Sequence, residues 1–548
     1  MGPAILPSSP SPTAIFPQEK RITAWKLRLD SWMVNDGKTF VYVAVWLFLQ
    51  TLLFVLAFVN YAVSDNFKGI RGRFGLPLLV ARASAMNLHV SSGIILFPVC
   101  RTILTWLRST PLNHVVPFDA SISFHKLCGY TIAFFTLVHV VAHVFNYMVL
   151  AAESGSSWVA LWFGNGPGWT GNIMLLCLIL LFFTAGKSVR RRRFEAFWYT
   201  HHLFIPFFAF FAFHGTFCLL KPDRPPYCAQ AGSFWKYWIA SGTLYLAERL
   251  ARELRSRRAI SVNKVILHPS QVVEIQLHAP FIKAKAGQYL FLCCPEISPL
   301  QWHPFTLTSA PEEDYISVHV RLVGDWTTQL ATRLGCDSGL SEDEKVMGAE
   351  EVEEEIELGR TLPRFLIDGP FGSASEDVFK YEVAVLVGAG IGVTPFASVL
   401  KSIWYRVSQP KKSTKLHKVY FFWVCRDYRQ FEWFQDLLKA IEEQDLDHFL
   451  EIHVYLTGRL QPDEIKNVII NNDDGYQDAL TGLRAATNYG RPNLDQIFTG
   501  LRRSHEDSDL GVFFCGPKPL GRSLKAACTK YSQSGDTGTR FFYNKENF

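Results

Sequence analysis

The sequence predicts a chain of three structural parts: a bundle of six transmembrane helices, an antiparallel β-barrel and an α/β domain of the Rossmann type. Long uncharged runs fill roughly the first 250 of the 548 residues, whereas the remainder has an ordinary soluble composition. Alternating apolar and polar residues at Val262–Leu267 and Val272–Leu277 are typical of antiparallel strands. Further on, the continuous apolar strand Val383–Val387 precedes a glycine turn and a helical stretch, as in a mostly parallel α/β sheet.

Six apolar runs in the first part are long enough, or nearly so, to cross a bilayer, which requires about 20 apolar residues. They are Thr39–Ser64, Ala83–Cys100, Leu127–Ala152, Thr170–Gly186, Ala196–Leu220 and Ser233–Ala247. The sixth is the weakest because Lys236 interrupts it, although a lysine near one end can reach the membrane surface. Six spans place both termini on the same side.

Basic residues predict which side is cytosolic, because Lys and Arg are enriched at the cytosolic ends of membrane helices. Four clusters fall on one side in the six-helix arrangement, namely Lys20–Arg28, Arg101 with Arg108, Arg190–Arg193 and Arg249–Arg258. Lys68, Arg71 and Arg73 fall on the other side and oppose the assignment. The four clusters outweigh these three residues, so we expect both termini in the cytosol, in a plasma or internal membrane.

Composition excludes several other classes of protein. The net charge of +6 is modest and shows no nucleic-acid footprint, and the 11 cysteines include no CxxC pair of the kind found in zinc fingers. Met1–Pro17 is rich in Pro and Ser, lacks a signal-peptide core and is expected to be a disordered cytosolic tail. The acidic run Glu342–Glu357 is interpreted as a solvated loop.

Histidines inside the apolar runs indicate a functional site, because ionisable side chains are costly in a bilayer. His125 and His139 are 14 residues apart, so they share one helix face and are separated by about 21 Å. His201 and His214 are 13 residues apart, and Pro206 between them can kink the helix. Two such helices can hold two stacked haems, each ligated by two imidazoles.

The topology pairs His125 with His201 near the cytosolic face and His139 with His214 near the outer face. On spacing alone, His202 competes with His201. For any single histidine, packing or proton relay is the commoner role, but four matched positions favour haem ligation. Arg101 and Arg108 are suited to haem propionates, because arginine pairs well with carboxylates, or else are ordinary membrane-interface anchors.

A run in the second part can hold a flavin ring and its ribityl chain. It comprises His303, Pro304, Phe305, Thr306, Leu307, Thr308 and Ser309, whose alternation presents backbone amides and hydroxyls. Downstream, His319 and Arg321 supply a pair suited to a pyrophosphate, and Trp326 and Thr327 add an aromatic ring and a hydroxyl. Each of these motifs is weak evidence for a flavin site by itself, since a barrel strand without a ligand would have a similar sequence.

The third part contains a nucleotide-binding pattern in its required strand–turn–helix context. Gly388, Gly390, Ile391, Gly392, Thr394 and Pro395 lie in the turn, where glycines let the backbone approach a pyrophosphate at a helix N-terminus. Arg426 follows the next strand and can meet a 2′-phosphate, which favours NADPH over NADH, and Arg491 is a second candidate cation. Cys515, Gly516 and Pro517 end a late strand beside which a nicotinamide can lie, and the terminal Phe548 can stack on the flavin.

Together these motifs resemble the NADPH oxidase catalytic subunits, of the fungal NoxA type and similar to the phagocyte flavocytochrome b subunit. The resemblance spans residues 30–548 and rests on five motifs besides the glycine loop. These are Phe124-His125-Lys126, the block Tyr199–Leu203, the HPFTLTSAPEED run from His303, DGPFG from Asp368, and the terminal NKENF.

The resemblance implies a ferredoxin-reductase type of flavin and nucleotide region, with FAD, two b-type haems and NADPH, and superoxide formed by one-electron reduction of O2. It implies four segments: 1–37 a cytosolic N-terminal segment, 38–258 the di-haem membrane domain, 259–375 the FAD domain and 376–548 the NADPH domain. It selects His201 over His202 as haem ligand. The partners that it implies are a cytosolic activator protein, a Rac-type GTPase and a small membrane adaptor subunit.

The resemblance also assigns residues that the motifs alone do not. It places Arg82 and His143 beside the oxygen-reducing pocket and Arg191 near the FAD, and it makes Ile391, Arg426, Thr457 and Arg491 contacts of NADPH. The acidic run at Glu342–Glu357 is longer than in the phagocyte enzyme, which leaves the packing between barrel and α/β sheet there open.

Two other functions compete with the oxidase. A ferric-chelate reductase would use the same haems and flavin and pass electrons to chelated iron. A membrane haem protein of a second class would donate electrons to a protein or quinone. The motifs do not name the electron acceptor, but few soft metal ligands are expected on the outer side, chiefly Cys218 and Cys228.

Overall fold

The computed structural model describes residues 29–217, 222–224, 232–268, 271–336, 362–408, 415–427, 431–443, 449–458, 478, 480–532 and 538–546. The chain divides into two compact units. Thr39–Leu254 form a helical unit, and Met1–Lys38 together with Arg255–Phe548 form a unit that contains the strands. The predicted tail Met1–Pro17, the acidic run Glu342–Glu357 and Phe548 lie outside the described residues, as do Cys218 and Cys228.

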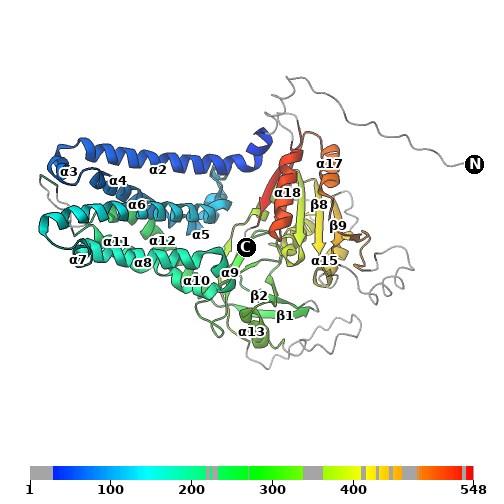
Figure 1. Ribbon diagram of the computed structural model, residues 1–548. Helices are drawn as coiled ribbons and strands as arrows, with labels where there is room; N and C mark the ends of the chain where they lie inside the picture. The colour runs from blue at the N-terminus through cyan, green and yellow to red at the C-terminus, as the bar shows by residue number, and fades with distance from the viewer. Residues whose placement is uncertain are drawn as a thin grey trace, which may run out of the picture. The chain divides into compact units, whose positions relative to one another are not determined.

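The helical unit is built from helices that run side by side (Figure 1). They are α2 (Lys38–Val63), α4 (Leu76–Ile94), α6 (Ser121–Ser154), α8 (Gly166–Ala185), α10 (Phe194–His201), α11 (Phe204–His214) and α12 (Trp235–Ser256). Further helices connect them, including α3 (Lys68–Phe74), α5 (Arg101–Arg108), α7 (Trp158–Gly164) and α9 (Lys187–Arg192).

The core of this unit is aromatic and aliphatic, and its helices are linked by polar contacts. Leu88, Ile132, Leu178 and Phe211 are buried against one another from four different helices. Trp46 Nε1 donates to Thr131 Oγ1 at 3.0 Å and so joins α2 to α6. Large apolar side chains elsewhere on the helices are exposed, as on a surface that faces lipid rather than water.

Five helical stretches among the described residues are long and apolar enough to cross a membrane. They are Leu29–Val63, Leu76–Val99, Phe118–Ser154, Gly166–Ala185 and Phe194–His214. Each overlaps one of the first five predicted spans. The weakest predicted span, Ser233–Ala247, falls on α12, which is a helix of 22 residues but does not join that set of five.

The predicted fifth span is interrupted in its first half. Helix α10 ends at His201, and α11 begins at Phe204 after a tight turn. Pro206 explains the break, because it has no N–H with which to bond the carbonyl of His202 four residues earlier. That carbonyl instead accepts from the amide of Ile205 at 2.9 Å. The interruption changes the angular relation between His201 and His214 from that of a straight helix.

The first part of the strand-containing unit has two three-stranded antiparallel sheets. One has the order β1 (Ser261–His268), β2 (Val272–His278), β5 (Ile316–Arg321), and the other β4 (His303–Thr306), β3 (Tyr289–Cys293), β6 (Leu366–Phe371). An isolated bridge between Leu307 and Val318 links them, and both pack on one apolar core with helix α13 (Asp325–Leu334). The predicted antiparallel pairing of β1 and β2 is confirmed.

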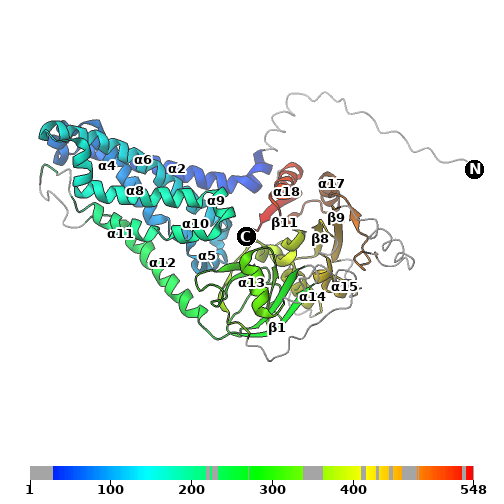
Figure 2. The same cartoon turned by 60° about the horizontal axis from the view of Figure 1, so that its bottom comes forward.

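The second part is a parallel sheet of six strands with helices on both faces (Figure 2). The order is β10 (Asn488–Tyr489), β9 (Leu450–Leu456), β8 (Lys418–Cys425), β7 (Val383–Ala389), β11 (Asp509–Cys515), β12 (Arg540–Lys545). Helices α14 (Thr394–Ser408) and α15 (Glu432–Glu442) pack on one face, and α17 (Leu494–Ser504) and α18 (Lys518–Tyr531) on the other. Strand order reverses between β7 and β11, which makes this pair the topological switch point.

The N-terminal segment covers the open edge of this sheet. Residues Met33–Gly37 form a single π-helical turn beside the edge strand β12. Asn35 Nδ2 donates to the carbonyl of Phe541 at 3.0 Å, and the amide of Tyr543 donates to Asn35 Oδ1 at 2.8 Å. Lys525 and Asp36 form an ion pair next to them. One side-chain amide thus bonds two strand groups on an edge, of which the carbonyl of Phe541 also accepts from Ser532 Oγ at 3.5 Å.

Replacing Asn35 with Ala is expected to expose the edge of β12. Each lost hydrogen bond costs about 0.5–1.5 kcal/mol, so amide exchange at Tyr543 should accelerate by roughly 2–13-fold. Asn35→Asp keeps the acceptor oxygen and should preserve most of the protection. Hydrogen exchange on the full chain, read by mass spectrometry across residues 540–546, measures both variants. Equal protection of Tyr543 in wild type and Asn35→Ala would show that the contact does not hold the strand.

Candidate functional site

Two pairs of imidazoles face each other inside the helical unit. His125 and His139 lie on α6, while His201 ends α10 and His214 ends α11. The ring centroids of His125 and His201 are 6.2 Å apart, and those of His139 and His214 are 6.4 Å apart. Both pairs have an interplanar angle of 59°. The structure therefore brings together the four histidines in the predicted pairs.

The spacing of each pair fits a metal ion between the rings. An imidazole nitrogen binds a metal at about 2.0 Å and lies about 1.1 Å from its ring centroid, so two rings on opposite sides are about 6.2 Å apart. The observed separations match the ligated arrangement, so these residues fit a bis-imidazole haem iron.

Hydrogen bonds at Nδ1 fix the orientation of three of the four rings. His125 Nδ1 lies 2.9 Å from the carbonyl of Ile95, and His139 Nδ1 lies 3.0 Å from that of Ala81. His214 Nδ1 lies 2.8 Å from Thr170 Oγ1. A partner at Nδ1 leaves Nε2 as the ligating atom, which is the usual arrangement around a metal-bound histidine.

His202 does not share this arrangement. Its side chain is exposed, its Nδ1 lies 2.9 Å from the carbonyl of Trp198, and its ring contacts the ring of Trp198. His201, one residue earlier, has a buried Nδ1 and faces His125. Geometry thus separates two histidines that spacing alone leaves equivalent.

The predicted polar pair Arg82 and His143 lies around the second imidazole pair. His143 follows His139 by one helical turn, and their ring centroids are 4.5 Å apart. Arg82 is on α4, next to Ala81, whose carbonyl bonds His139, and its guanidinium lies 5.9 Å from the ring centroid of Tyr61. Asn146 Nδ2 lies 3.5 Å from His143 Nδ1. A cation and an additional imidazole therefore accompany this pair.

The other predicted basic residues of the helical unit lie on its short helices. Arg108 is buried and forms an ion pair with Asp119, with 3.0 Å between Nε and Oδ1. Arg101 begins the same helix, α5. Arg191 is exposed on α9, where it belongs to a run of basic residues. These positions leave the predicted roles of Arg101, Arg108 and Arg191 as predictions.

The predicted flavin run forms β4 and the loop that follows it. His303 stacks on Trp326 with 4.1 Å between ring centroids, and Phe305 lies farther from the same indole. Thr306, Thr308 and Ser309 are buried or half-buried, and Leu307 belongs to the core, while Pro304 is exposed. Arg321, the predicted pyrophosphate ligand, is exposed at the end of β5.

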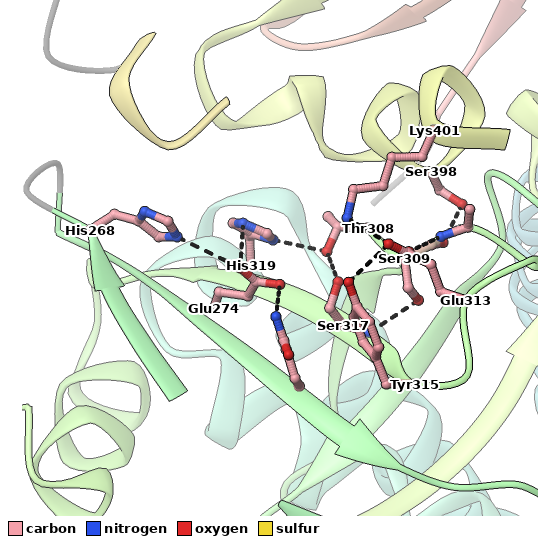
Figure 3. Close-up of polar contacts among 12 residues, drawn as sticks. His268, Glu274, Thr308, Ser309, Glu313, Tyr315, Ser317, His319, Ser398 and Lys401 are labelled. Carbon is pink, nitrogen blue, oxygen red and sulfur yellow. Dashed lines mark hydrogen bonds and ion pairs between the residues drawn. The ribbon is translucent and has the colours of Figure 1, made fainter. Parts of the chain in front are cut away.

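Three hydroxyls of this region are already engaged within the chain (Figure 3). Thr308 Oγ1 lies 2.7 Å from Ser317 Oγ and 2.8 Å from His319 Nδ1, and Ser309 Oγ accepts from the amide of Ser317. The hydroxyl of Thr327 accepts from the amide of Gly324 at 3.0 Å and so caps α13. Burial lowers the pKa of His319 to about 3, so its imidazole is neutral at pH 7.

The predicted nucleotide residues converge at the carboxyl edge of the parallel sheet. Gly388 is the last residue but one of β7, and Gly390, Ile391 and Gly392 form the turn before Thr394 and Pro395 open α14. Cys515 ends β11 and is followed by Gly516 and Pro517. This edge, at the switch point, is where open α/β sheets bind ligands. Burial raises the pKa of Cys515 to about 12, so it is a neutral thiol at pH 7.

Glycine is required where the turn after β7 meets the end of β11. A Cβ on Gly392 would lie 2.5 Å from the carbonyl oxygen of Cys515, and one on Gly516 would lie 2.8 Å from the Cβ of Ala389. Backbone atoms fill the first position, so a side chain there would push the two strand ends apart. The sequence indicated that the glycines let the backbone approach a ligand. The structure shows that they also let the turn after β7 approach the end of β11.

The remaining nucleotide candidates follow the neighbouring strands in order. Arg426 comes after β8 and is exposed. Thr457 comes after β9, and its amide and hydroxyl both donate to the carbonyl of Cys425, at 2.8 and 2.9 Å. Arg491 follows β10 and is exposed. Two cations thus follow β8 and β10, which lie on the side of β7 away from the switch point.

Sequence reasoning missed the contacts that join the flavin loop to α14 (Figure 3). Thr394 Oγ1 donates to Thr306 Oγ1 at 3.4 Å, and Ser398 Oγ donates to the carbonyl of Ser309 at 2.6 Å. Lys401 Nζ pairs with a carboxylate oxygen of Glu313 at 3.3 Å. The contacts recur at helical spacing along one face of α14, a pattern of small polar residues that has no distinctive signature in the sequence.

Three family models match successive regions of the chain. They describe a ferric reductase like transmembrane component over residues 90–212, an FAD-binding domain over residues 257–375 and a ferric reductase NAD binding domain over residues 381–529. The second region covers the antiparallel sheets, and the third covers β7 to β11 of the parallel sheet.

Several characterised proteins are similar along nearly their whole length. A superoxide-generating NADPH oxidase heavy chain of Dictyostelium discoideum is 41% identical over 95% of this chain and 99% of its own. NADPH oxidase 3 of Homo sapiens is 37% identical over 95% of this chain and 100% of its own. NADPH oxidase 1 of Mus musculus is also 37% identical, over 95% of this chain and 96% of its own.

Solved structures give weaker likenesses. A flavohemoglobin from Malassezia yamatoensis is 14% identical, with a TM-score of 0.35, over 88% of this chain and 100% of its own. A ferredoxin NADP+ reductase from Neisseria gonorrhoeae is 14% identical, with a TM-score of 0.33, over 52% of this chain and 99% of its own. Both TM-scores are too low to support an argument.

Replacing Gly392 with Ala should weaken nucleotide binding by separating the ends of β7 and β11. Overpacking of this kind costs about 1–3 kcal/mol, so the KM for NADPH should rise by roughly 5–150-fold in assays of flavin reduction. Gly500→Ala is the matched control, because no atom lies within 4 Å of its Cβ position in α17. An unchanged KM in Gly392→Ala would contradict the importance of this close approach.

Proposed function

Because this chain belongs to the NADPH oxidase family, we propose that it carries electrons from cytosolic NADPH through FAD and two b-type haems across a membrane to dioxygen, producing superoxide. The observation that supports this most directly is the pair of imidazole sites in one bundle, with centroid separations of 6.2 and 6.4 Å. Two sites with one geometry suit sequential electron transfer.

The four histidines would hold the two haem irons, His125 with His201 and His139 with His214. The carbonyls of Ile95 and Ala81 hold two of these rings from the loop after α4 and from α4 itself. His125 and His139 are 14 residues apart on one continuous helix, so the two sites are about 21 Å apart along it. With two sites this far apart, an electron would cross a bilayer core of about 30 Å in several short transfers instead of one long transfer.

When bound, FAD accepts a hydride and the haems carry single electrons, which is the conversion that an NADPH-driven one-electron reduction needs. The residues of this chain supply position and charge. Each haem would be held by two imidazoles, and dioxygen would be reduced at the haem edge. Arg82 and His143 would lie beside the second pair, where a cation and a hydrogen-bond donor favour formation of an anion.

The flavin would bind along β4 and its following loop, held by the predicted run His303–Ser309 with Arg321 at the pyrophosphate. NADPH would bind at the turn Gly388–Pro395, with Arg426 and Arg491 at the 2′-phosphate and Thr457 and Cys515–Pro517 around the edge. Support comes from the convergence of these residues at the switch point of the sheet. His319, Trp326, Thr327, Arg191 and Phe548 remain predicted flavin contacts.

We further propose six membrane spans with both termini in the cytosol, α12 being the sixth. Tyr237 on this helix donates to the sulfur of Met86 on α4, and Phe234, just before it, stacks on Phe211 with 4.0 Å between centroids. The two antiparallel sheets around one core would form the predicted barrel. Arg101 and Arg108 would meet haem propionates. A small membrane adaptor, a cytosolic activator and a Rac-type GTPase remain predictions from the resemblance.

A ferric-chelate reductase is the second candidate. The match of residues 90–212 to a ferric reductase like transmembrane component favours it, since the same electron path serves both reactions. Superoxide-dismutase-sensitive reduction of an external dye, measured with and without ferric chelate, separates the two. Dismutase-insensitive reduction that requires the chelate would favour the reductase and contradict the oxidase.

His139→Leu should remove the haem that this residue ligates and abolish superoxide formation, while NADPH still reduces the flavin. The bis-imidazole site needs both rings, and leucine offers no ligand. Haem content per protein should therefore fall by about half, as measured by the pyridine haemochrome spectrum and dismutase-sensitive dye reduction.

His202→Leu is the matched control, because the side chain of His202 is exposed and its ring contacts that of Trp198. This variant should keep both haems and the full rate. Full haem content in His139→Leu would exclude His139 as a ligand.

Arg82→Ala and His143→Ala should keep both haems and the electron flow to them but slow superoxide formation. Loss of one donor beside a developing anion typically costs about 2.7–4 kcal/mol, and a reaction at the haem edge is expected to show a loss at or below this range. The measurement is the rate of haem reoxidation by O2 after anaerobic reduction.

Arg73→Ala serves as the control, because this residue pairs with Glu153 where both side chains are exposed. Reoxidation at the wild-type rate in both Arg82→Ala and His143→Ala would remove these residues from the mechanism.

A further inference from the structure

Three potential metal ligands from three strands meet at one end of the antiparallel sheet β1-β2-β5 (Figure 3). His268 is the last residue of β1, Glu274 lies on β2, and His319 lies on β5. Glu274 and His319 are direct partners in the β2–β5 ladder, and His268 flanks the turn between β1 and β2. One ligand atom of each residue lies within 4.8 Å of the other two.

The distances within this cluster are too long for hydrogen bonds and suit a bound ion. Glu274 Oε2 lies 3.7 Å from His319 Nε2 and 3.9 Å from His268 Nε2. Hydrogen bonds between such atoms are about 2.7–3.2 Å long. Ligands about 2.0–2.2 Å from a tetrahedral zinc ion are about 3.4 Å apart, so both distances from Glu274 Oε2 are within about half an ångström of those in a zinc site.

The other atoms of these side chains are held as they are around bound metals. His319 Nδ1 lies 2.8 Å from Thr308 Oγ1, and Gln276 Nε2 donates to Glu274 Oε1 at 3.1 Å. These contacts leave His319 Nε2 and Glu274 Oε2 directed at the centre of the cluster. His268 Nε2 is buried and has no hydrogen-bond partner among the described residues. The cluster therefore contains an unsatisfied donor nitrogen that points to a ligand.

Burial adds an electrostatic argument. The side chains of Glu274 and His319 are 10% and 7% exposed. Trp433 covers the His319 ring with 4.6 Å between centroids, and the Nζ of Lys401 pairs with Glu313. A carboxylate removed from water requires a compensating positive charge. A divalent cation between two imidazoles and this carboxylate would supply it.

We propose that His268, Glu274 and His319 form a binding site for a divalent transition-metal ion of the zinc type. Two imidazole nitrogens and one carboxylate oxygen are a donor set that zinc accepts, with water completing a tetrahedral shell. The ion would fasten the β1–β2 hairpin to β5 and, through His319 and Thr308, the loop after β4. The proposal gives His319 a metal in place of the predicted flavin contact, and it is independent of the electron acceptor.

The test measures zinc in the full-length, tag-free protein purified in detergent, dialysed against a zinc-buffered solution and then against buffer alone. Wild type is expected to retain about one zinc per chain by plasma mass spectrometry, on top of its haem iron. The zinc K-edge absorption spectrum should show a nitrogen and oxygen shell at about 2.0–2.1 Å. His268→Ala and Glu274→Gln should each lower retained zinc by at least about tenfold.

His278→Ala is the matched control, because His278 is an exposed histidine at the other end of β2. It should retain zinc as wild type does. Haem and flavin content report whether each variant folds. If Glu274→Gln does not fold, His268→Ala still tests the proposal. His268 is the most exposed of the three residues, so its replacement should disturb the fold least.

Two results would overturn the proposal. Wild-type protein that is replete in haem and flavin yet holds no zinc would show that the cluster does not bind the metal. Zinc retained equally by His268→Ala and wild type would place the ion elsewhere. In support of it, added zinc should raise the temperature of flavin release in wild type and in His278→Ala, but not in His268→Ala.

Discussion

Each buried imidazole in the helical unit has two nitrogens, and a fixed oxygen at one of them determines where the other points. Ile95, Ala81 and Thr170 provide those oxygens for three of the four rings. The positions of α4, α8 and the loop after α4 therefore determine the geometry of both imidazole pairs. The break between α10 and α11 also affects the orientation of the rings, because it sets the direction of His201 independently of that of His214.

A comparable constraint operates in the parallel sheet. The turn after β7 approaches the end of β11 so closely that Gly392 admits no side chain. Because β7 and β11 border the switch point, the same close approach brings backbone amides to the edge where a pyrophosphate can bind. The polar face of α14 then ties this turn to the flavin loop through Ser398 and Lys401. Nucleotide and flavin regions are thus joined by one helix.

The sequence predicted what depends on local pattern and failed where long-range contacts decide. Helical spacing sufficed to select His125 and His139, and the strand–glycine–helix order sufficed to locate the turn at Gly388–Thr394. The contact of Asn35 with β12 spans 506 residues in sequence, and a lone asparagine carries no pattern that reveals it. The break before Phe204 was foreseen only as a kink at Pro206, because propensity does not state which hydrogen bonds replace the missing one.

His268, Glu274 and His319 illustrate why such a cluster is invisible in sequence and yet sharply defined in the fold. They lie on three strands, and a shift of one residue in either pairing would turn a side chain to the opposite face of the sheet. Register therefore creates the cluster, and an ion bound there would in turn favour that register over its alternatives. Binding energy at this point would stabilise the sheet that positions Thr308, so a structural metal and the flavin loop would depend on the same strand pairing.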